Sequence, residues 1–506
     1  MNDTVLRLAL AGGLGVVTMI LIAIDSFLNK RINRRYGSLD LFSKRAPVVV
    51  LFLFLGFALA FPDRFEYLMH KQFELLLLFA AATIIILGMT PLLRKKLSSK
   101  SCAELWILPS VTLYLLFLVV CFSDRRESQP WIVIHIPRSL LRLMVILWLT
   151  GFCTVMIWKA ASHLRFRRAI LREAKWGSEH DYALFRKVLK DLVPIKSSHV
   201  VRVDEDYERG RKLRIVRSSE VSSPLTIGLF DKTSCLVLPD QEYTDQELQM
   251  IFRHECIHLM HEDNKLKFSV TVWCAVGWFI PTLWIGMKRM SEDMELCCDE
   301  LVTEGMGPSE RKEYADLLLH TAGTEKGFTT CLSASAQGLR YRLRGIMRPK
   351  GGKNGILVMG LLAALGVFFF GTVGISMDVG TVQTELLNQY SDSWKVTEVE
   401  ISGRGDYWHI ETVEKHFGEL RLAKELWHSP QTNSNYPLPT SDGTIRIDLQ
   451  QIKNRTMSLW LSPDADGRLY LYNDGVLYSN QIGAWYRVLL DDESQAWLRS
   501  MGIKCQ

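Results

Sequence analysis

The chain contains the segment Arg253-His254-Glu255-Cys256-Ile257-His258, in which two histidines stand four positions apart with a glutamate directly after the first. On a helix, side chains at this spacing lie on one face, one turn apart. Both imidazoles can therefore reach one zinc ion. Glu255 can contact a water bound to that ion and take its proton. The segment predicts a hydrolytic metal site.

A carboxylate is the expected third ligand, because no histidine stands at the spacing that metzincins use. Downstream, Glu295 and Asp299 are four positions apart and would share one helix face. An acidic residue behind a ligand histidine fixes the tautomer of its ring. We therefore predict one zinc ion held by His254, His258 and Glu295, with Glu255 as the catalytic base and Asp299 and Asp263 as the carboxylates that orient the histidines.

Other side chains near these residues offer alternatives. Cys297 and Cys298 could act as soft ligands, but the two histidines and Glu295 already complete a set that leaves a position for water. His261 lies near the same helix face and is more simply a helix-end residue. Arg342 and Arg344 are candidates for stabilising the oxyanion of the reaction.

Two elements are predicted to position the histidines. Thr244-Asp245-Gln246-Glu247 has the pattern of a capping box, which indicates that a helix starts here and carries the motif. Thr233–Pro239 precedes it and reads as a strand. In zinc proteases, an edge strand beside the metal can pair with the backbone of the substrate.

The composition combines soluble and membrane-like regions. Apolar residues make up 48% of the 506 residues, charged residues make up 23%, and the net charge is +6. Basic residues cluster beside long apolar runs, as in membrane proteins, so we expect contact with a lipid bilayer and no direct binding of nucleic acid. The ten cysteines fall mostly in these runs or in segments expected in the cytosol, so no disulfide framework is predicted.

Six apolar runs are predicted to span a membrane, which takes about 20 residues per helix. They are Val5–Leu28, Pro47–Phe61, Leu75–Leu93, Leu105–Phe122, Leu143–Trp158 and Gly355–Ile375. Lysine and arginine concentrate after the first, third and fifth runs and before the sixth, which places those loops in the cytosol. The loop that holds Arg125, Arg126, Arg138 and Arg142 argues the other way. We predict that the N-terminus is outside the cell.

The predicted domains follow from this topology. They are a five-span transmembrane region at 1–159, a cytosolic zinc metalloprotease domain at 160–353, a sixth span at 354–376 and an extracellular domain at 377–506. A single crossing by Phe268–Met287 would separate His258 from Glu295. Pro281 interrupts this run, so a membrane-associated hairpin over 268–288 is predicted instead.

The C-terminal region reads as a small α+β domain. Alternating patterns predict strands, and a final amphipathic stretch predicts a helix: Thr444–Leu449, Met457–Leu461, Leu469–Tyr472, Ala484–Leu490 and Asp491–Met501. Asn473-Asp474-Gly475 predicts a hairpin turn before a strand at Val476–Tyr478. The region has no evident catalytic set, so it is predicted to sense or bind an unidentified extracellular ligand.

Together these motifs resemble those of the BlaR/MecR-type membrane metallopeptidases, the antirepressor sensor-transducers of Gram-positive bacteria. The similar pieces, which cover roughly residues 160–350, are Ser223–Gly228, Leu238-Pro239, His254–Asp263, Trp278–Pro281 and Glu295–Glu300. The resemblance implies a gluzincin fold with zinc ligands at His254, His258 and Glu295, a base at Glu255 and an acidic partner at Asp299. It also implies an extracellular sensor and cleavage of a winged-helix repressor.

The C-terminal region departs from this family. Its β-lactam receptors carry a penicillin-binding sensor about twice as large, with an S-x-x-K nucleophile. Residues 376–506 contain no S-x-x-K, so acylation by β-lactams is not expected.

The sequence therefore predicts a multi-span α-helical membrane protein with a cytosolic α+β gluzincin domain and a small α+β extracellular domain. We expect a zinc endopeptidase that transduces an extracellular signal by cleaving a cytosolic peptide or protein, such as a winged-helix repressor. One alternative is a non-enzymatic receptor with a structural zinc, which has no need of Glu255. Another is a transporter, which the scarcity of charge within the spans beyond Asp25 disfavours.

Overall fold

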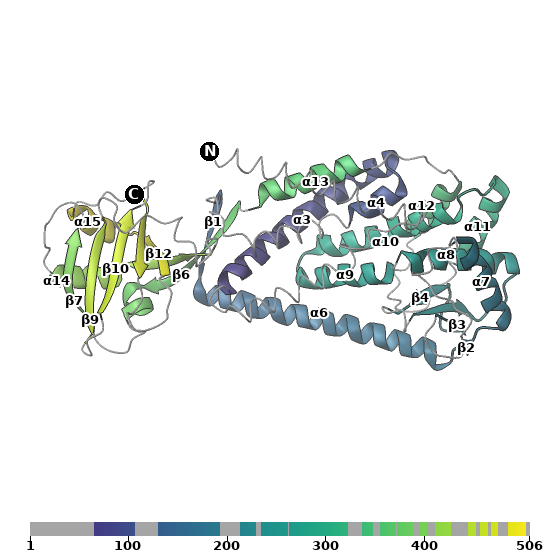
Figure 1. Ribbon diagram of the computed structural model, residues 1–506, viewed down its shortest axis with the longest axis horizontal. Helices are drawn as coiled ribbons and strands as arrows, with labels where there is room; N and C mark the ends of the chain where they lie inside the picture. The colour runs from purple at the N-terminus through teal and green to yellow at the C-terminus, as the bar shows by residue number, and fades with distance from the viewer. Residues whose placement is uncertain are drawn as a thin grey trace. The chain divides into compact units, whose positions relative to one another are not determined.

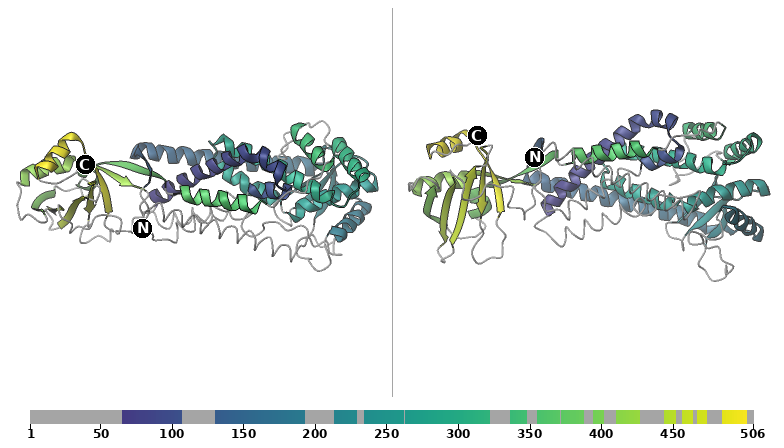
Figure 2. Two further views of the ribbon diagram at one scale, coloured as in Figure 1. Left: turned by 90° about the horizontal axis from the view of Figure 1, so that it is seen from above. Right: turned by 45° about the horizontal axis from the view of Figure 1, so that its top comes forward.

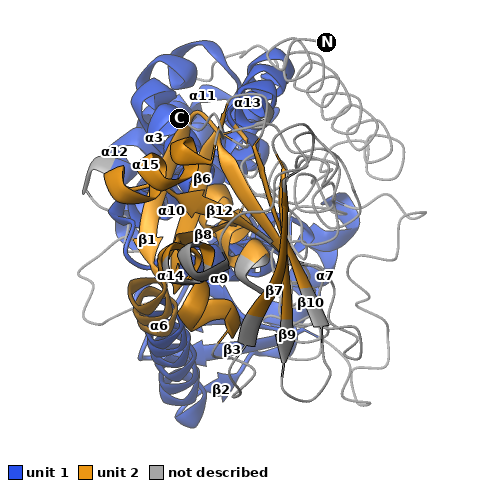
Figure 3. Cartoon of the chain, turned by 90° about the vertical axis from the view of Figure 1, so that its left-hand side faces the viewer, with its two compact units in different colours: residues 1–53, 76–121, 148–369 blue, residues 54–75, 122–147, 370–506 orange. Residues whose placement is uncertain are grey.

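The chain folds into two compact units, each assembled from separate stretches of sequence (Figures 1 and 3). One unit contains residues 1–53, 76–121 and 148–369, and the other contains 54–75, 122–147 and 370–506. The computed structural model describes residues 65–106, 130–192, 213–228, 234–261, 263–321, 336–347, 355–370, 372–387, 394–401, 410–426, 444–451, 456–463, 467–473 and 484–501. The first two expected spans and most of the fourth lie outside these residues.

Two of the described helices are long and apolar enough to cross a membrane. They are α3 (Phe65–Lys96) and α6 (Arg138–Arg172), with 32 and 35 residues. Each contains one expected span, and α6 extends past both ends of Leu143–Trp158 because arginine, which is abundant in its flanks, is a good helix former. Ile146 and Ile157 on α6 are 62% and 69% exposed, which suits a surface in contact with lipid.

The helix in the sixth expected span is shorter than the sequence predicts. α13 (Ile356–Phe369) has 14 residues, and Val373–Ile375 belong instead to strand β6 (Val373–Thr381). Valine and isoleucine favour a strand once neighbours can pair with it, so the helix ends before the predicted boundary at 376. α13 lies beside α3 (Figure 2). It packs against α3 and α4 (Ser99–Leu105) through an apolar cluster that contains Leu93, Leu105, Met359 and Ala363.

A four-stranded sheet in the first unit has the order β2-β3-β5-β4. Its strands are β2 (Lys175–Trp176), β3 (Arg214–Ser218), β4 (Leu225–Ile227) and β5 (Cys235–Pro239). β3 and β5 are parallel, and β2 and β4 pair antiparallel with them at the two edges. The strand predicted at Thr233–Pro239 is present as β5. It lies inside the sheet with all its residues buried, so the edge strand is β4 and not the segment that the sequence suggested.

Helix α8 (Asp245–Met260) carries the two histidines and begins with the predicted capping box. The Thr244 hydroxyl accepts from the Glu247 backbone N–H, and the Thr244 backbone N–H donates to the Glu247 carboxylate at 2.8 Å. One face of the helix enters a core shared with α7 (Glu179–Leu192) and α11 (Pro308–Thr321). That core contains Phe185, Phe252, Ile257 and Tyr314, each at most 2% exposed.

The apolar run Phe268–Met287 forms parts of two helices. α9 (Asp263–Val276) and α10 (Pro281–Val302) are separated by a short turn, and Pro281 is the first residue of α10, where its missing N–H costs nothing. The Cys274 thiol donates to the Leu283 carbonyl oxygen at 3.6 Å, so the two helices pack together near the turn. α12 (Ala336–Met347) then packs against α10. This arrangement brings the far end of α10 back to α8.

The second unit is built on an eight-stranded sheet with the order β1-β6-β8-β12-β11-β10-β9-β7. Its remaining strands are β1 (Ile132–Pro137), β7 (Trp394–Ile401), β8 (Arg421–Glu425), β9 (Ile445–Gln451), β10 (Thr456–Pro463), β11 (Leu469–Asn473) and β12 (Ala484–Leu489). β1 pairs parallel with β6, in the register Ile134 to Ile375, and the other pairs are antiparallel.

This sheet is larger than the predicted C-terminal domain. β6 begins before residue 377, and β1 comes from the segment that precedes α6. The strands and the helix expected between 444 and 501 are present as β9 to β12 and α15 (Asp492–Ser500). α15 and α14 (Ile410–Glu419) contribute Trp497 and Phe417 to the core, and a short π-helical turn at Gln383–Leu387 follows β6. Residues 474–483, with the expected turn and Val476–Tyr478, lie outside the described part of the chain.

A buried ion pair joins α7 to the four-stranded sheet. Asp181 is 1% exposed and accepts from Arg217 on β3, at 2.8 Å from Nη2 and 3.2 Å from Nε. Asp181 Oδ2, the oxygen that accepts from Arg217 Nε, also accepts from the Ser178 backbone N–H at 2.9 Å. Burial alone raises the pKa of Asp181, but the hydrogen bonds from Arg217 and Ser178 outweigh it, so the pKa lies below its usual value.

We predict that Asp181→Asn lowers the free energy of unfolding by about 3–5 kcal/mol, because Arg217 would keep its charge without a carboxylate to balance it. The loss should be full above about pH 4 and should shrink as the pH falls through the lowered pKa of Asp181. Asp240→Asn, which breaks the exposed pair with Lys175, serves as the control and should cost under about 1 kcal/mol. Denaturant titrations at pH 7 and pH 3 measure both, and equal losses in the two variants would contradict the assignment.

Candidate active site

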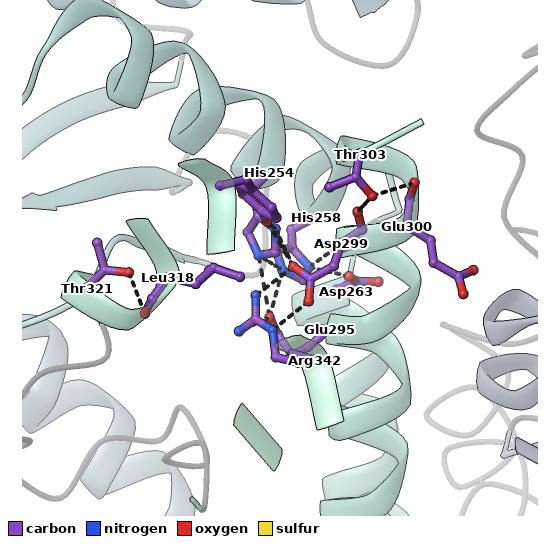
Figure 4. Close-up of polar contacts among 12 residues, drawn as sticks. His254, His258, Asp263, Glu295, Asp299, Glu300, Thr303, Leu318, Thr321 and Arg342 are labelled. Atoms are coloured by element: carbon purple, nitrogen blue, oxygen red, sulfur yellow. Dashed lines mark hydrogen bonds and ion pairs between the residues drawn. The ribbon is translucent and has the colours of Figure 1, made fainter. Parts of the chain in front are cut away.

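Three side chains converge at the meeting point of α8 and α10 (Figure 4). His254 Nε2 and His258 Nε2 are 3.0 Å apart, and Glu295 Oε2 lies 3.4 Å and 3.5 Å from them. These are the three residues for which the sequence predicts a shared metal. They come from consecutive turns of α8 and from the far part of α10, which the turn between α9 and α10 carries back toward the histidines.

The triangle formed by these atoms has the dimensions of one face of a zinc site. Four ligands placed tetrahedrally at zinc–nitrogen and zinc–oxygen distances are about 3.3 Å from one another. The three observed separations, 3.0, 3.4 and 3.5 Å, are close to this value. Two imidazoles and a carboxylate are also the donor set of a catalytic site, which leaves a fourth position for water. The residues present therefore fit a zinc ion.

The ring of His258 is oriented by Asp263, the first residue of α9. His258 Nδ1 lies 2.5 Å from Asp263 Oδ2, so Nδ1 carries the hydrogen and Nε2 keeps its lone pair for a metal. Burial lowers the pKa of His258, but Cys298, Glu295 and Asp263 together raise it by more. The pKa of His258 therefore lies well above its usual value. The site therefore attracts a positive charge to this ring.

The ring of His254 is oriented through a tyrosine that the sequence did not point to. Tyr314 Oη lies 3.0 Å from His254 Nδ1 and donates to Asp299 Oδ1 at 2.9 Å. Because the tyrosine hydrogen is used on Asp299, the oxygen accepts from His254 Nδ1–H, and Nε2 is again left free. Asp299 was expected to contact a ligand histidine directly, but the closest approach is 3.6 Å and Tyr314 stands between them.

Arg342 on α12 completes this chain of contacts (Figure 4). Its Nε and Nη2 donate to the two oxygens of Asp299 at 2.7 and 2.8 Å, and Nη1 lies 3.5 Å from Glu295 Oε2. Lys267 lies 3.7 Å from the other oxygen of Glu295. Burial raises the pKa of Glu295, but His258, His254 and Arg342 outweigh it, so its pKa lies well below the usual value. Glu295 is therefore a carboxylate at neutral pH.

Glu255, the expected base, points toward the edge strand of the sheet. Its Oε2 accepts from the Thr226 hydroxyl on β4 at 2.7 Å, and the side chain is 5% exposed. Asn264, the second residue of α9, donates from Nδ2 to the carbonyl oxygens of Thr226 and Gly228 at 2.9 and 3.4 Å. The start of α9 therefore fixes both sides of the site: Asp263 orients His258, and Asn264 holds β4, whose Thr226 contacts Glu255.

The alternatives raised by the sequence take other positions. Cys298 Sγ lies 3.4 Å from His258 Nδ1, on the edge of the ring opposite Nε2, and burial raises the pKa of this thiol to about 12. A metal held by Cys298, Asp263 and His258 would need the Nδ1 that Asp263 already occupies. His261 caps the end of α8, and Arg344 is exposed whereas Arg342 reaches the site.

Comparisons with known proteins found similarity over part of the chain. Residues 126–344 match the family described as BlaR1 peptidase M56. The regulatory protein BlaR1 of Bacillus licheniformis is 21% identical over 160 residues, which are 31% of this chain. The methicillin resistance mecR1 protein of Staphylococcus aureus is 29% identical over 112 residues, which are 22% of this chain, and that of Staphylococcus epidermidis matches equally. Residues 126–344 thus form a region of the BlaR/MecR type.

The matched segments cover only 27% of the length of the BlaR1 relative and 19% of the mecR1 relatives. BlaR1 peptidases of the M56 class are metallopeptidases, so the match implies a metal. The family match includes all six residues for which the sequence predicts a role at the site: His254, Glu255, His258, Asp263, Glu295 and Asp299.

The structure adds side chains around the six predicted site residues for which the sequence predicted no role. The structure brings all six together, but Tyr314, Thr226 and Lys267 had no predicted role. The sequence suggests Arg342 only as a residue that stabilises the oxyanion, whereas its main partner in the structure is Asp299. Tyr314 is 60 positions from His254 and on a different helix, so no local spacing could have revealed it.

We predict that Tyr314→Phe weakens zinc binding by about 10- to 100-fold, because His254 Nδ1 would lose its acceptor and the ring its fixed orientation. Tyr182→Phe is the matched control, since that hydroxyl donates to the Ile215 carbonyl oxygen and accepts from the Ile215 backbone N–H. Competition with a chelator of known affinity measures the zinc dissociation constant. Equal constants for Tyr314→Phe and the parent chain would refute this role.

Proposed function

We propose that this chain is a membrane-embedded zinc endopeptidase of the BlaR/MecR type, with His254, His258 and Glu295 as ligands of one zinc ion and Glu255 as the base. The observation that carries the proposal is the triangle of donor atoms, with each Nδ1 held by a separate acceptor. A structural zinc site has four protein ligands, whereas this set offers three and places a buried glutamate next to the first histidine.

The proposed chemistry is hydrolysis of a peptide bond. When bound, zinc polarises the peptide carbonyl and lowers the pKa of the attacking water. Glu255 accepts a proton from that water and then donates it to the amine nitrogen as the C–N bond breaks. The products are a carboxylic acid and an amine. Thr226 restrains one oxygen of Glu255. β4 is an edge strand of the sheet among the described residues, and we propose that an extended peptide pairs beside it.

The grouping of segments in the structure supports the predicted membrane orientation. The second unit contains residues 54–75, 122–147 and 370–506, which include each described segment that the charge pattern places outside the cell. β1 and β6 form one ladder, so they must lie on the same side of a bilayer. We infer that the protease domain is cytosolic and that the sheet of the second unit is extracellular.

Signal transduction by cleavage of a cytosolic protein fits this arrangement. The matched relatives are named as a regulatory protein and as methicillin resistance proteins, which supports a regulatory substrate such as a winged-helix repressor. The eight-stranded sheet is the proposed receiver of an extracellular ligand.

The competing function is a non-enzymatic receptor in which zinc only braces the cytosolic domain. Glu255→Gln separates the two functions. We predict that this variant keeps its zinc and its melting temperature but loses at least about 100-fold in peptide cleavage, because the carboxamide cannot accept the proton. Zinc content, thermal unfolding and a chelator-sensitive cleavage assay measure the three properties. Cleavage at the parental rate would exclude Glu255 as the base.

The orientation has its own test. We predict that a cysteine at Trp131 reacts with a membrane-impermeant thiol reagent in intact cells, whereas one at Lys100 reacts only after the membrane is opened. Both side chains are about half exposed, so access to the reagent depends on the side of the membrane. The parent chain gives the background from its own cysteines. The reverse pattern would mean that the domain with the zinc site lies outside the cell.

A further inference from the structure

Two neighbouring residues of α12 face different partners. Arg342 pairs with Asp299 at 2.7 and 2.8 Å and approaches Glu295, as described above. Tyr341 instead lies against the guanidinium of Arg94, whose carbon is 4.4 Å from the centre of the tyrosine ring. Arg94 belongs to the last turn of α3, one of the two described helices that are long and apolar enough to span a membrane. α12 therefore contacts both a membrane helix and the zinc site.

Arg94 is a fixed partner. Its Nε and Nη2 each lie 2.7 Å from Asp293 Oδ1, and Asp293 is 1% exposed. The other oxygen of Asp293 accepts from the indole N–H of Trp106 at 2.8 Å. A guanidinium held in this way presents a flat face in a defined position, which is the geometry that stacks on an aromatic ring. Tyr341 therefore packs on a rigid surface at the end of α3.

The rest of α12 is also held closely. At Gly345, a Cβ would come within 2.4 Å of the end of the Leu296 side chain, so α12 approaches α10 closely here and a larger residue would require Leu296 to move. Arg311 on α11 donates to the carbonyl oxygens of Thr303 and Ile346, both at 3.2 Å. The second half of α12 is thus fixed against α10 and α11, and the contact between Tyr341 and Arg94 anchors the middle of the helix to α3, next to Arg342.

We propose that Tyr341 and Arg94 are positioning residues, through which the cytosolic end of α3 holds Arg342 against Asp299 and Glu295 and so sets the geometry of the zinc site. The chain of contacts runs from Arg94 to Tyr341, from Arg342 to Asp299, and through Tyr314 to His254. This inference rests on the proposed function and names a way in which a membrane helix controls it. A displacement of α3 that separates Arg94 from Tyr341 releases Arg342 from the site.

The test uses the full chain in detergent or lipid nanodiscs, with zinc affinity measured by chelator competition and cleavage measured as kcat and KM. Tyr341→Leu and Arg94→Met should each weaken zinc binding and lower kcat by about three- to tenfold, with little change in KM. Tyr341→Phe keeps the ring and should therefore have the zinc affinity, kcat and KM of the parent chain. Arg344→Ala, an exposed arginine on the same helix, should match the parent chain.

The double variant Arg94→Met/Tyr341→Leu distinguishes coupling from two independent effects. If both residues act through one contact, the double variant is no worse than the more impaired single variant. Effects that multiply, or a parental zinc affinity in Tyr341→Leu, would overturn the proposal. If Tyr341→Leu does not fold, Arg94→Lys decides it, since lysine keeps the charge beside Asp293 but loses the planar stacking. A parental zinc affinity in Arg94→Lys would overturn the proposal.

These readouts separate this proposal from the proposed function. Zinc affinity requires no cleavage, so a chain that binds zinc through His254 and His258 but cuts no peptide refutes the protease assignment alone. A chain that cuts peptides while Tyr341→Leu leaves its zinc affinity and kcat unchanged refutes the positioning role alone.

Discussion

The hydrogen bonds to the Nδ1 atoms of His254 and His258 are the constraint on which the rest of the domain depends. Each bond leaves an Nε2 lone pair directed at the same point, and each acceptor comes from a different helix. Asp263 begins α9, and Tyr314 lies within α11. The turn between α9 and α10 then returns Glu295 to the same point. The packing of four helices can thus be understood as a means of fixing two ring orientations.

The carboxylates around the site outnumber the basic side chains that lie near them among the described residues. Glu295, Asp299 and Asp263 are all partly or fully buried, and Arg342 and Lys267 lie near them. The raised pKa of His258 expresses the excess of negative charge, because a proton on the ring relieves it. A metal ion supplies the same relief and competes with that proton, so metal affinity in such sites falls as the pH falls.

The features that the sequence could predict are those carried by local spacing. His254, Glu255 and His258 share one helix turn, the capping box starts that helix, and Glu295 and Asp299 are one turn apart on another. Tyr314, Thr226 and Tyr341 act across distant elements, and no periodicity marks them. The topology of the second unit was missed for the same reason: β1 lies in a segment read as a loop, and its strand partner is far along the chain.

The parallel pairing of β1 with β6 has a consequence for the biosynthesis of the protein. β1 ends at Pro137, and its partner begins only at Val373. At roughly 5–20 residues per second, a ribosome needs on the order of ten to fifty seconds to make the intervening chain. Throughout that interval, Trp131, Ile132 and Ile134 form an apolar segment with an unpaired backbone. Early ribosomal arrest or premature termination would leave this segment unpaired and prone to aggregation. We therefore expect a chaperone or the bilayer surface to cover it until translation is complete.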